Sequence, residues 1–379
     1  MVTSSATRPS GALFNANGTV PAFIFVPDPG RAALRIASLT VLDRLVVAAH
    51  RGGCGPITIV SAAPLPPLKR ARALRIPINV AREAPDASEP ALLISAELLV
   101  QAADVRRCLQ SGARLIDAGG APLPLGLAAP AHAEVEAMLL GLPELRAEGV
   151  ALRVENAADA ARAEKLLWAS LTSASDGLVD KVFNRPCGRP LSKLLIRTPI
   201  TPNMVSIVSV LIGVAAAGLF AAGEQTLALA GAILFQISAI VDCVDGDIAR
   251  VVFKESPLGK WIDLVGDQVV HVSIFSGIAF GIYRTEPSNL VLWLGLAAVL
   301  GAIVSFAVVL RGMRQAAGQT GPLRRLIDAA TNRDFSVLVL ALTAARELDL
   351  FLWLAAVGSH LFWMAALALQ LSVRCSRRA

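Results

Sequence analysis

The C-terminal half of the sequence contains a series of apolar stretches, and these constrain the fold more than any other feature. A helix needs about 20 apolar residues to cross a bilayer, and it satisfies its own backbone hydrogen bonds there. We therefore predict a membrane domain of six transmembrane helices, at residues 203–222, 226–244, 262–283, 289–310, 335–345 and 350–373. The fifth stretch is short, and we expect residues 326–333 to extend it.

The composition agrees with a polytopic membrane protein. Of the 379 residues, 55% are hydrophobic and 17% are charged, which is too apolar for an ordinary soluble enzyme. The net charge of +6 suits contact with anionic lipid head groups, so membrane lipids are expected partners. Few aromatic residues accompany the cations, so no nucleic acid is expected. Residues 1–200 contain no long apolar run and are expected to be soluble, without a signal peptide.

Lys and Arg are distributed unevenly between the connections of these stretches. They are frequent before the first stretch, between the second and third, between the fourth and fifth, and after the sixth. The other connections are short and hold few cations. By the positive-inside rule, both termini and the second connection then lie in the cytoplasm. We predict a multi-pass protein of the inner (cytoplasmic) membrane.

Four aspartates stand where the second and third apolar stretches approach each other in sequence. Asp242 and Asp245 are three residues apart, and Asp263 and Asp267 are four apart. On helices, each spacing places both carboxylates on one face. Carboxylates at the edge of hydrocarbon are costly and mark functional sites, although a salt-bridge network between helices is the alternative. Four of them would repel one another unless cations neutralised them, and hard oxygen ligands suit Mg²⁺, Mn²⁺ or Ca²⁺.

The residues around these aspartates follow the pattern D-x2-D-G-x2-A-R-x8-G-x3-D-x3-D. Its fixed positions are occupied by Asp242, Asp245, Gly246, Ala249, Arg250, Gly259, Asp263 and Asp267. This pattern resembles the signature of the CDP-alcohol phosphotransferase family, also called CDP-alcohol phosphatidyltransferases. The resemblance implies six transmembrane helices. It also implies an enzyme that moves a substituted phosphate from a CDP-alcohol donor to an acceptor hydroxyl and releases CMP.

The resemblance also implies roles for individual residues. All four aspartates would bind Mg²⁺ or Mn²⁺, as two ions, and Asp267 would also be the catalytic general base. The expected CDP-alcohol contacts are Asn203, Ser206, Gly246, Ala249, Arg250, Ser256 and Gly259. Taken alone, Ser206 and Ser256 are explained equally well by packing or helix capping.

Two further segments, at residues 173–203 and 331–342, resemble the inositol-phosphate-using branch of this family. The donor would then be CDP-inositol or CDP-diacylglycerol, and the acceptor a lipid alcohol or an inositol phosphate. A phosphorylated acceptor needs cations, and Arg311 and Arg314 are the candidates, although positive-inside anchoring explains them equally well. Relatives in this family are dimeric, which favours a homodimer. The alternatives are a CDP-diacylglycerol-dependent synthase with another head group and an ion-coupled transporter.

Residues 1–165 are expected to form a separate α/β, Rossmann-like cytosolic domain. Apolar runs at residues 22–26, 56–61 and 91–95 predict strands, and residues 39–50 predict a helix between them. The order resembles a sugar-phosphate nucleotidyltransferase. The Gly-rich phosphate loop is absent, because only Gly30 is present there, and Ala96 and Glu97 stand where the metal-binding aspartate is expected. We therefore predict a catalytically degenerate domain with a scaffolding, dimerisation or regulatory role.

Residues 166–200 are expected to connect this domain to the membrane domain at 201–379. Residues 134–149 and 157–171 have helical composition. Cations then recur about every four residues, at Lys181, Arg185, Arg189, Lys193 and Arg197. This spacing predicts an amphipathic helix that lies in the membrane interface, with a solvated polar face as the alternative.

Overall fold

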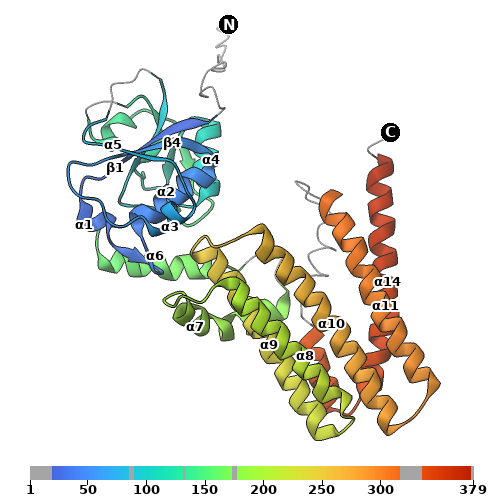
Figure 1. Ribbon diagram of the computed structural model, residues 1–379. Coiled ribbons are helices and arrows are strands. Elements are labelled where there is room, and N and C mark those ends of the chain that lie inside the picture. Colours follow the sequence, from blue (N-terminus) through green and yellow to red (C-terminus); the bar gives the residue numbers. More distant parts are fainter. Residues whose placement is uncertain (1–18, 85–88, 131–132, 173–176, 316–334, 377–379) are drawn as a thin grey trace. The chain divides into compact units, whose positions relative to one another are not determined.

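The computed structural model describes residues 19–84, 89–130, 133–172, 177–315 and 335–376, without the side chains of 314–315 and 373–376. The chain forms two compact units, Met1–Ser170 and Leu171–Ala379 (Figure 1).

The first unit is built on a five-stranded sheet of order β5-β4-β1-β6-β9. Its strands are β1 (Val20–Phe25), β4 (Cys54–Val60), β5 (Ile78–Ala81), β6 (Ala91–Ser95) and β9 (Leu125–Ala128). β1 pairs in parallel with β4 and β6, and β4 pairs in parallel with β5. β9 is antiparallel to β6 and closes one edge. The predicted α/β sheet is confirmed. The apolar run at residues 91–95 forms β6, and all five of its residues are buried.

Short elements and helices surround this sheet. They are α1 (Pro29–Ala32), β2 (Arg35–Ile36), β3 (Leu39–Thr40), α2 (Val41–Gly52), α3 (Lys69–Ala73), β7 (Leu98–Leu99), α4 (Ala102–Ser111), β8 (Arg114–Ile116), α5 (Val135–Met138), β10 (Glu144–Arg146), β11 (Leu152–Arg153) and α6 (Ala157–Ala169). The helix predicted over residues 134–149 forms only at Val135–Met138, which is α5. Gly141 has a positive φ of 79°, Pro143 follows it, and β10 then pairs in parallel with β8.

Helix α6 belongs to the first unit through a buried polar contact. The backbone N–H of Ala37 donates to the Glu164 carboxylate of α6 at 3.0 Å. The Arg44 guanidinium of α2 donates to the carbonyls of Ile36 and Ala37 at 2.8 and 3.3 Å. Burial lowers the pKa of Arg44 to about 10, and the nearby Glu164 carboxylate opposes that shift. Because these contacts and the buried side chain of Trp168 hold α6, the first unit extends to the end of this helix.

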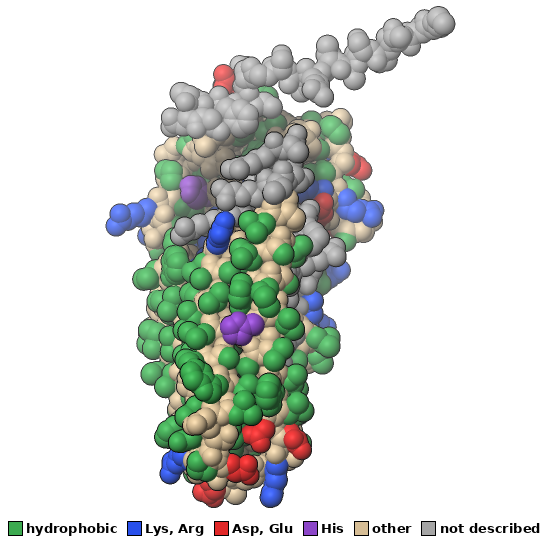
Figure 2. Space-filling view, turned by 90° about the vertical axis from the view of Figure 1, so that its right-hand side faces the viewer, with side chains coloured by type: hydrophobic (Ala, Val, Ile, Leu, Met, Phe, Trp, Pro, Cys, Tyr) green, Lys and Arg blue, Asp and Glu red, His purple; other side chains and the backbone are tan. Residues whose placement is uncertain are grey.

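The second unit is helical. It contains η1 (Asp180–Asn184), α7 (Arg185–Leu195), α8 (Pro202–Ala221), α9 (Gln225–Val251), α10 (Pro257–Thr285), α11 (Asn289–Gln315), α13 (Phe335–Ala344) and α14 (Leu348–Ser376). Five of these, α8, α9, α10, α11 and α14, are long and apolar enough to cross a membrane. Figure 2 shows hydrophobic side chains along one face of this unit and charged ones gathered at its lower end. This distribution is typical of a protein embedded in lipid.

The predicted count of six spans is not confirmed. The fifth predicted span corresponds to α13, whose 10 residues extend about 15 Å, roughly half of the hydrocarbon thickness. Residues 326–333, expected to lengthen it, lie outside the described part of the chain. The second span was predicted to end at the first aspartate pair and the third to begin with the second pair. In both cases the helix is longer than the predicted span, since α9 continues to Val251 and α10 already begins at Pro257.

Helices α8 and α10 approach each other closely through small residues. Gly277 and Gly281 lie one turn apart on α10. A Cβ atom placed on Gly277 would be 2.3 Å from the Ala217 carbonyl oxygen, and one on Gly281 would be 2.1 Å from that of Phe220. A small-xxx-small pair of this kind lets two membrane helices pack backbone against backbone.

Helix α7 packs against α9, and this corrects one prediction. Asn184, Arg185, Gly188 and Ser192 form the buried face. Arg185 is therefore not on a lipid-facing or solvated face as its spacing suggested, because positions four residues apart also form a packing face. The opposite face exposes apolar side chains, including Phe183, Leu191 and Leu194. Placement of this face in the membrane interface stays a prediction.

Candidate active site

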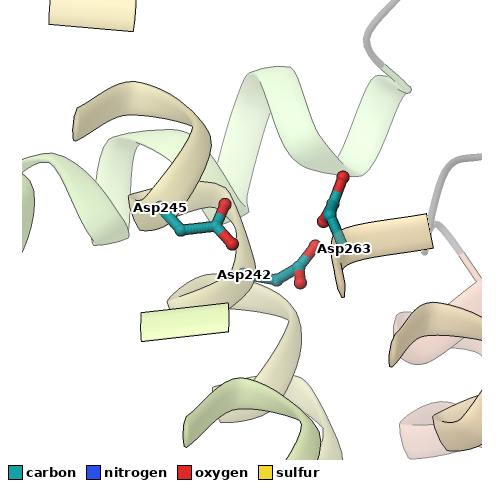
Figure 3. A group of neighbouring side chains, drawn as sticks. All are labelled: Asp242, Asp245 and Asp263. Atoms are coloured by element: carbon teal, nitrogen blue, oxygen red, sulfur yellow. The ribbon is translucent and has the colours of Figure 1, made fainter. Parts of the chain in front are cut away.

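Three of the four predicted metal ligands meet near the connection between α9 and α10, two helices that both pack against α8. Asp242 and Asp245 of α9 and Asp263 of α10 each offer one carboxylate oxygen, and the three oxygens lie within 4.8 Å of one another. Figure 3 shows these side chains directed toward a common point from two helices. Asp245 is buried, Asp242 is half-buried and Asp263 is exposed. The cluster is therefore anchored in the helix bundle and open on one side.

Helix α8 positions the two carboxylates of α9. The Ser206 hydroxyl donates to Asp245 Oδ2. The Ser209 hydroxyl lies 3.2 Å from Asp242 Oδ1 and 2.9 Å from the Ser206 carbonyl oxygen. Sequence reasoning did not single out Ser209. The spacing of Ser206 and Ser209 on one face of an otherwise apolar helix is the signal that could have found it.

Asp267 lies one turn beyond Asp263 on α10 and is half-buried. It is outside the group of three carboxylates, although its charge still acts on Asp245, as do those of Asp242 and Asp263. Four like charges in this space repel one another strongly. Oxygen donors at this density fit a divalent cation, which would remove that repulsion.

The predicted CDP-alcohol contacts come together in one pocket beside this cluster. Its walls are formed by the ends of α8, α9 and α10 that meet at the cluster, and by the connection between α9 and α10. All seven predicted contacts line it, together with two of the aspartates: Asn203, Ser206, Gly246, Ala249, Arg250, Ser256, Gly259, Asp245 and Asp263.

Two cations of the pocket were not predicted as site residues. Lys254 and Lys260 also line it, as does Glu255, and with Arg250 the two lysines provide three positive charges in the same pocket as Asp245, Asp263 and Glu255. From the sequence, Lys254 and Lys260 were interpreted only as part of the cation distribution that predicts the orientation in the membrane. Their position indicates affinity for an anionic group such as a diphosphate.

The two glycines of the pocket lie close to side chains that line it. A Cβ atom on Gly259 would lie 2.9 Å from Asn203 Oδ1 and 3.0 Å from Ser256 Oγ. Ser256 caps α10, since its hydroxyl accepts a hydrogen bond from the Gly259 N–H at 2.9 Å. On Gly246, a Cβ atom would lie 3.3 Å from the Arg250 guanidinium. A larger residue at either position would displace a side chain that lines the pocket.

The predicted acceptor-binding residues are not part of this pocket as described. Arg311 is exposed near the end of α11 and does not line the pocket. The side chain of Arg314 lies outside the described residues. Both assignments stay predictions.

The first unit has a separate pocket at the carboxyl ends of its parallel strands. It measures about 810 Å³ and is lined by residues that follow β1, β4, β5 and β6. Four glutamates and one arginine line it: Glu83, Glu97, Glu134, Glu136 and Arg82. The Asp28 carboxylate accepts hydrogen bonds from the N–H groups of Gly30 and Arg31 at 2.7 and 3.4 Å. These are the N–H groups that would otherwise face a phosphate.

Most of the second unit matches one family of known proteins. Residues 199–371 match the family described as CDP-alcohol phosphatidyltransferase. This match covers less than half of the chain, and it includes every residue that lines the pocket, since these all lie between residues 202 and 263.

The curated relatives include two proteins that carry the same name. The chain is 32% identical over 196 residues to the bifunctional IPC transferase and DIPP synthase of Thermococcus kodakarensis, covering 50% of this chain and 44% of that protein. It is 33% identical over 190 residues to the protein of the same name from Rubrobacter xylanophilus, covering 50% of this chain and 41% of that one. The chain thus spans less than half the length of these relatives.

Among solved structures, the chain is similar to the phosphatidylinositol phosphate synthase of Mycobacterium tuberculosis in its apo form. The identity is 24%, the match covers 47% of this chain and 93% of that chain, and the TM-score is 0.37. The cytoplasmic orientation and the homodimer stay predictions.

Proposed function

We propose that the protein transfers a substituted phosphate from a CDP-alcohol to an acceptor hydroxyl and releases CMP. The observation that carries this proposal is the single pocket in which all seven predicted donor contacts and two of the four aspartates meet. Its chemistry matches the donor, because it places three cations beside a carboxylate cluster at the end of a membrane bundle. We further propose a role in inositol phospholipid or inositol phosphodiester synthesis, supported by a curated relative from Cutibacterium acnes that is named phosphatidylinositol phosphate synthase.

The reaction requires one bond to form and one to break at the same phosphorus. The acceptor oxygen attacks the phosphorus that carries the alcohol, and the bond from that phosphorus to the oxygen of CMP breaks. The acceptor hydroxyl loses its proton in this step. Asp267 is our candidate to take that proton, because it lies outside the group of three carboxylates and is less committed to metal binding. Arg250, Lys254 and Lys260 would orient the diphosphate.

Asp242, Asp245 and Asp263 would hold the divalent cation that this chemistry uses, and Asp267 would contribute to a second ion. A bound Mg²⁺ or Mn²⁺ supplies electrostatic stabilisation of the phosphate oxygens and the departing CMP. The chain's part is to fix the carboxylates, and the serines of α8 do so through the contacts of Ser206 and Ser209 with the α9 aspartates.

A donor–acceptor screen scored by CMP production tests this proposal. We expect the purified protein to release CMP when it receives Mg²⁺ or Mn²⁺, an acceptor, and either CDP-inositol or CDP-diacylglycerol. We expect CMP release to stop when a chelator is added and to return with excess Mg²⁺. Comparing the two donors, each with inositol phosphate and with a lipid alcohol, identifies the substrates. The absence of CMP in every combination, from a well-folded protein, would contradict the proposal.

We also propose that the first unit does not transfer nucleotides. The Asp28 carboxylate at the N–H groups of Gly30 and Arg31 opposes a triphosphate. The neighbouring pocket adds Glu83 and Glu134, besides Glu97 and Glu136, which pair with Arg31 and Arg153. We expect the full chain, incubated with CTP, inositol phosphate and Mg²⁺, to release no pyrophosphate above background. An active cytidylyltransferase assayed in parallel is the control, and pyrophosphate release by this chain at a comparable rate would refute the proposal.

A further inference from the structure

Asp247 is a buried carboxylate inside the aspartate-rich segment that the family pattern leaves unassigned. It lies directly after Gly246 on α9, and 1% of its side chain is exposed. Its Oδ1 atom accepts hydrogen bonds from the Arg185 guanidinium at 2.5 Å and from the Arg250 guanidinium at 3.4 Å. Arg185 comes from α7, and Arg250 lines the pocket. The Oδ1 atom of Asp247 therefore links α7, through Arg185, to Arg250 in the wall of the pocket.

The contact with Asp247 fixes where the Arg250 guanidinium lies. Arg250 is 37% exposed, and a flexible arginine at that exposure would otherwise sample several rotamers. Held by Asp247, its Nη2 atom lies 3.3 Å from the position of a Cβ atom on Gly246. The guanidinium thus lies beside Gly246, and both residues line the pocket. Asp247 itself cannot contact a ligand, because it is buried.

Arg185 has an electrostatic part in this arrangement. A buried aspartate paired with Arg250 alone would cancel the charge that Arg250 presents to an anion. With Arg185 as a second partner, the three groups together carry one net positive charge. The positioning function of Asp247 is then compatible with a cationic pocket.

Helix α7 is held in place by contacts that do not involve these charges. The Gln236 amide of α9 donates to Asn184 Oδ1 at 2.6 Å. A Cβ atom on Gly188 would lie 3.1 Å from the Ile240 carbonyl oxygen, so α7 packs directly on the α9 backbone. Arg185 is therefore delivered to Asp247 by a rigid helix–helix contact.

We propose that Asp247 is a positioning residue that orients Arg250 for the phosphates of the donor, and that Arg185, by neutralising Asp247, leaves the three groups with a net positive charge. The proposal rests on the proposed function, because it names a donor with phosphate groups. It adds α7 to the donor site, although α7 lies outside the family pattern.

A double-mutant cycle in the full chain tests it, with CMP release measured against donor concentration. Asp247→Asn keeps the side-chain volume and removes the charge that holds Arg250. We expect the KM for the CDP-alcohol to rise about tenfold, the scale set by one charge-assisted hydrogen bond, and kcat to change less. In an Arg250→Gln background, the same substitution should leave KM within about twofold, since the group on which it acts is gone.

Arg185→Lys provides a second cycle if Asp247→Asn does not fold. Lysine keeps the charge and loses the planar donor geometry, so we expect a smaller rise in KM, again absent in the Arg250→Gln background. Arg197→Gln, at an exposed cation shortly after α7, is the matched control and should leave KM unchanged.

The outcomes separate the two proposals. If the wild-type protein releases no CMP from any donor, the proposed function fails. If the wild-type protein is active and the effects on KM of Asp247→Asn and Arg250→Gln multiply independently, the positioning role is wrong. A loss of thermal stability with unchanged KM in both cycles would also overturn it, because it would show a merely structural ion pair.

Discussion

Replacing Asp245 by asparagine is expected to lower the rate of CMP release by about 10²–10³-fold, the scale on which one electrostatic stabiliser of a transition state acts. Asp245 is the buried member of the three-carboxylate group, and asparagine offers a neutral oxygen in place of a charged one. The fold should persist, because the volume is nearly unchanged and the Ser206 hydroxyl that donates to Asp245 can donate to the amide oxygen. CMP release and thermal unfolding in detergent measure the two effects.

The metal dependence of unfolding adds a test that does not need activity. Mg²⁺ or Mn²⁺ that binds the folded state raises the stability of the wild-type protein, by about 2.7 kcal/mol at a concentration 100 times the Kd. The Asp245→Asn protein should lose most of that increase, and without metal it should be at least as stable as the wild type, since one of four repelling charges is gone. Asp349→Asn, at an exposed position in the first turn of α14, is the control. Full activity in the Asp245→Asn protein would remove the aspartate cluster from the mechanism.

The aspartate cluster could be predicted from the sequence because its geometry is mostly local. Asp242 with Asp245, and Asp263 with Asp267, occupy neighbouring positions on one helix face, and both pairs lie near the connection between two consecutive helices. The contact of Ser209 with Asp242 depends on how α8 packs against α9, which no spacing within one helix specifies. The same holds for Lys254 and Lys260, whose place in the pocket depends on the path of the chain between α9 and α10.

The strands of the first unit were predictable for a similar reason, since a buried strand is a short apolar run such as β6. The segment at 134–149 was predicted as a helix from its composition. Gly141 and Pro143 end that helix after α5, and β10 forms because β8 offers it a pairing edge. Pairing with a distant strand outweighs local helix propensity, and it leaves no trace in the composition.

The cations of residues 166–200 show what a helical repeat cannot predict, namely which surroundings each side chain has. Arg185 and Arg189 repeat with the helical spacing, yet Arg185 is buried against Asp247 and Arg189 donates to Thr172 at 2.6 Å. A repeat of four residues identifies one face of a helix and does not reveal whether lipid, water or another helix covers it. The partner of Arg185 is 62 residues away in sequence.

Gly277 and Gly281 of α10 were not predicted from the sequence as packing residues. Gly281 is the basis of a second prediction with a large expected effect. Gly281→Ala is expected to destabilise the protein by about 3 kcal/mol, at the upper end of overpacking costs, and to reduce CMP release with it. One methyl group at Gly281 would stand 2.1 Å from the Phe220 carbonyl oxygen of α8, and backbone atoms cannot rotate away as a side chain can. Helices α8 and α10 would have to separate, and α8 carries Ser206 and Ser209 to the aspartates of α9. Thermal unfolding in detergent and CMP release measure the result.

Gly218→Ala makes the same chemical change on α8 at a place where a Cβ atom would meet nothing within 4 Å. Alanine is a better helix former than glycine by about 1 kcal/mol, so this variant should be as stable as the wild type or slightly more stable, with full activity. The opposite outcomes for two identical substitutions follow from backbone contact at Gly281 and open space at Gly218. Equal stability of the two variants would mean that α8 and α10 do not pack through this glycine, and that the serines of α8 reach the aspartates by another arrangement.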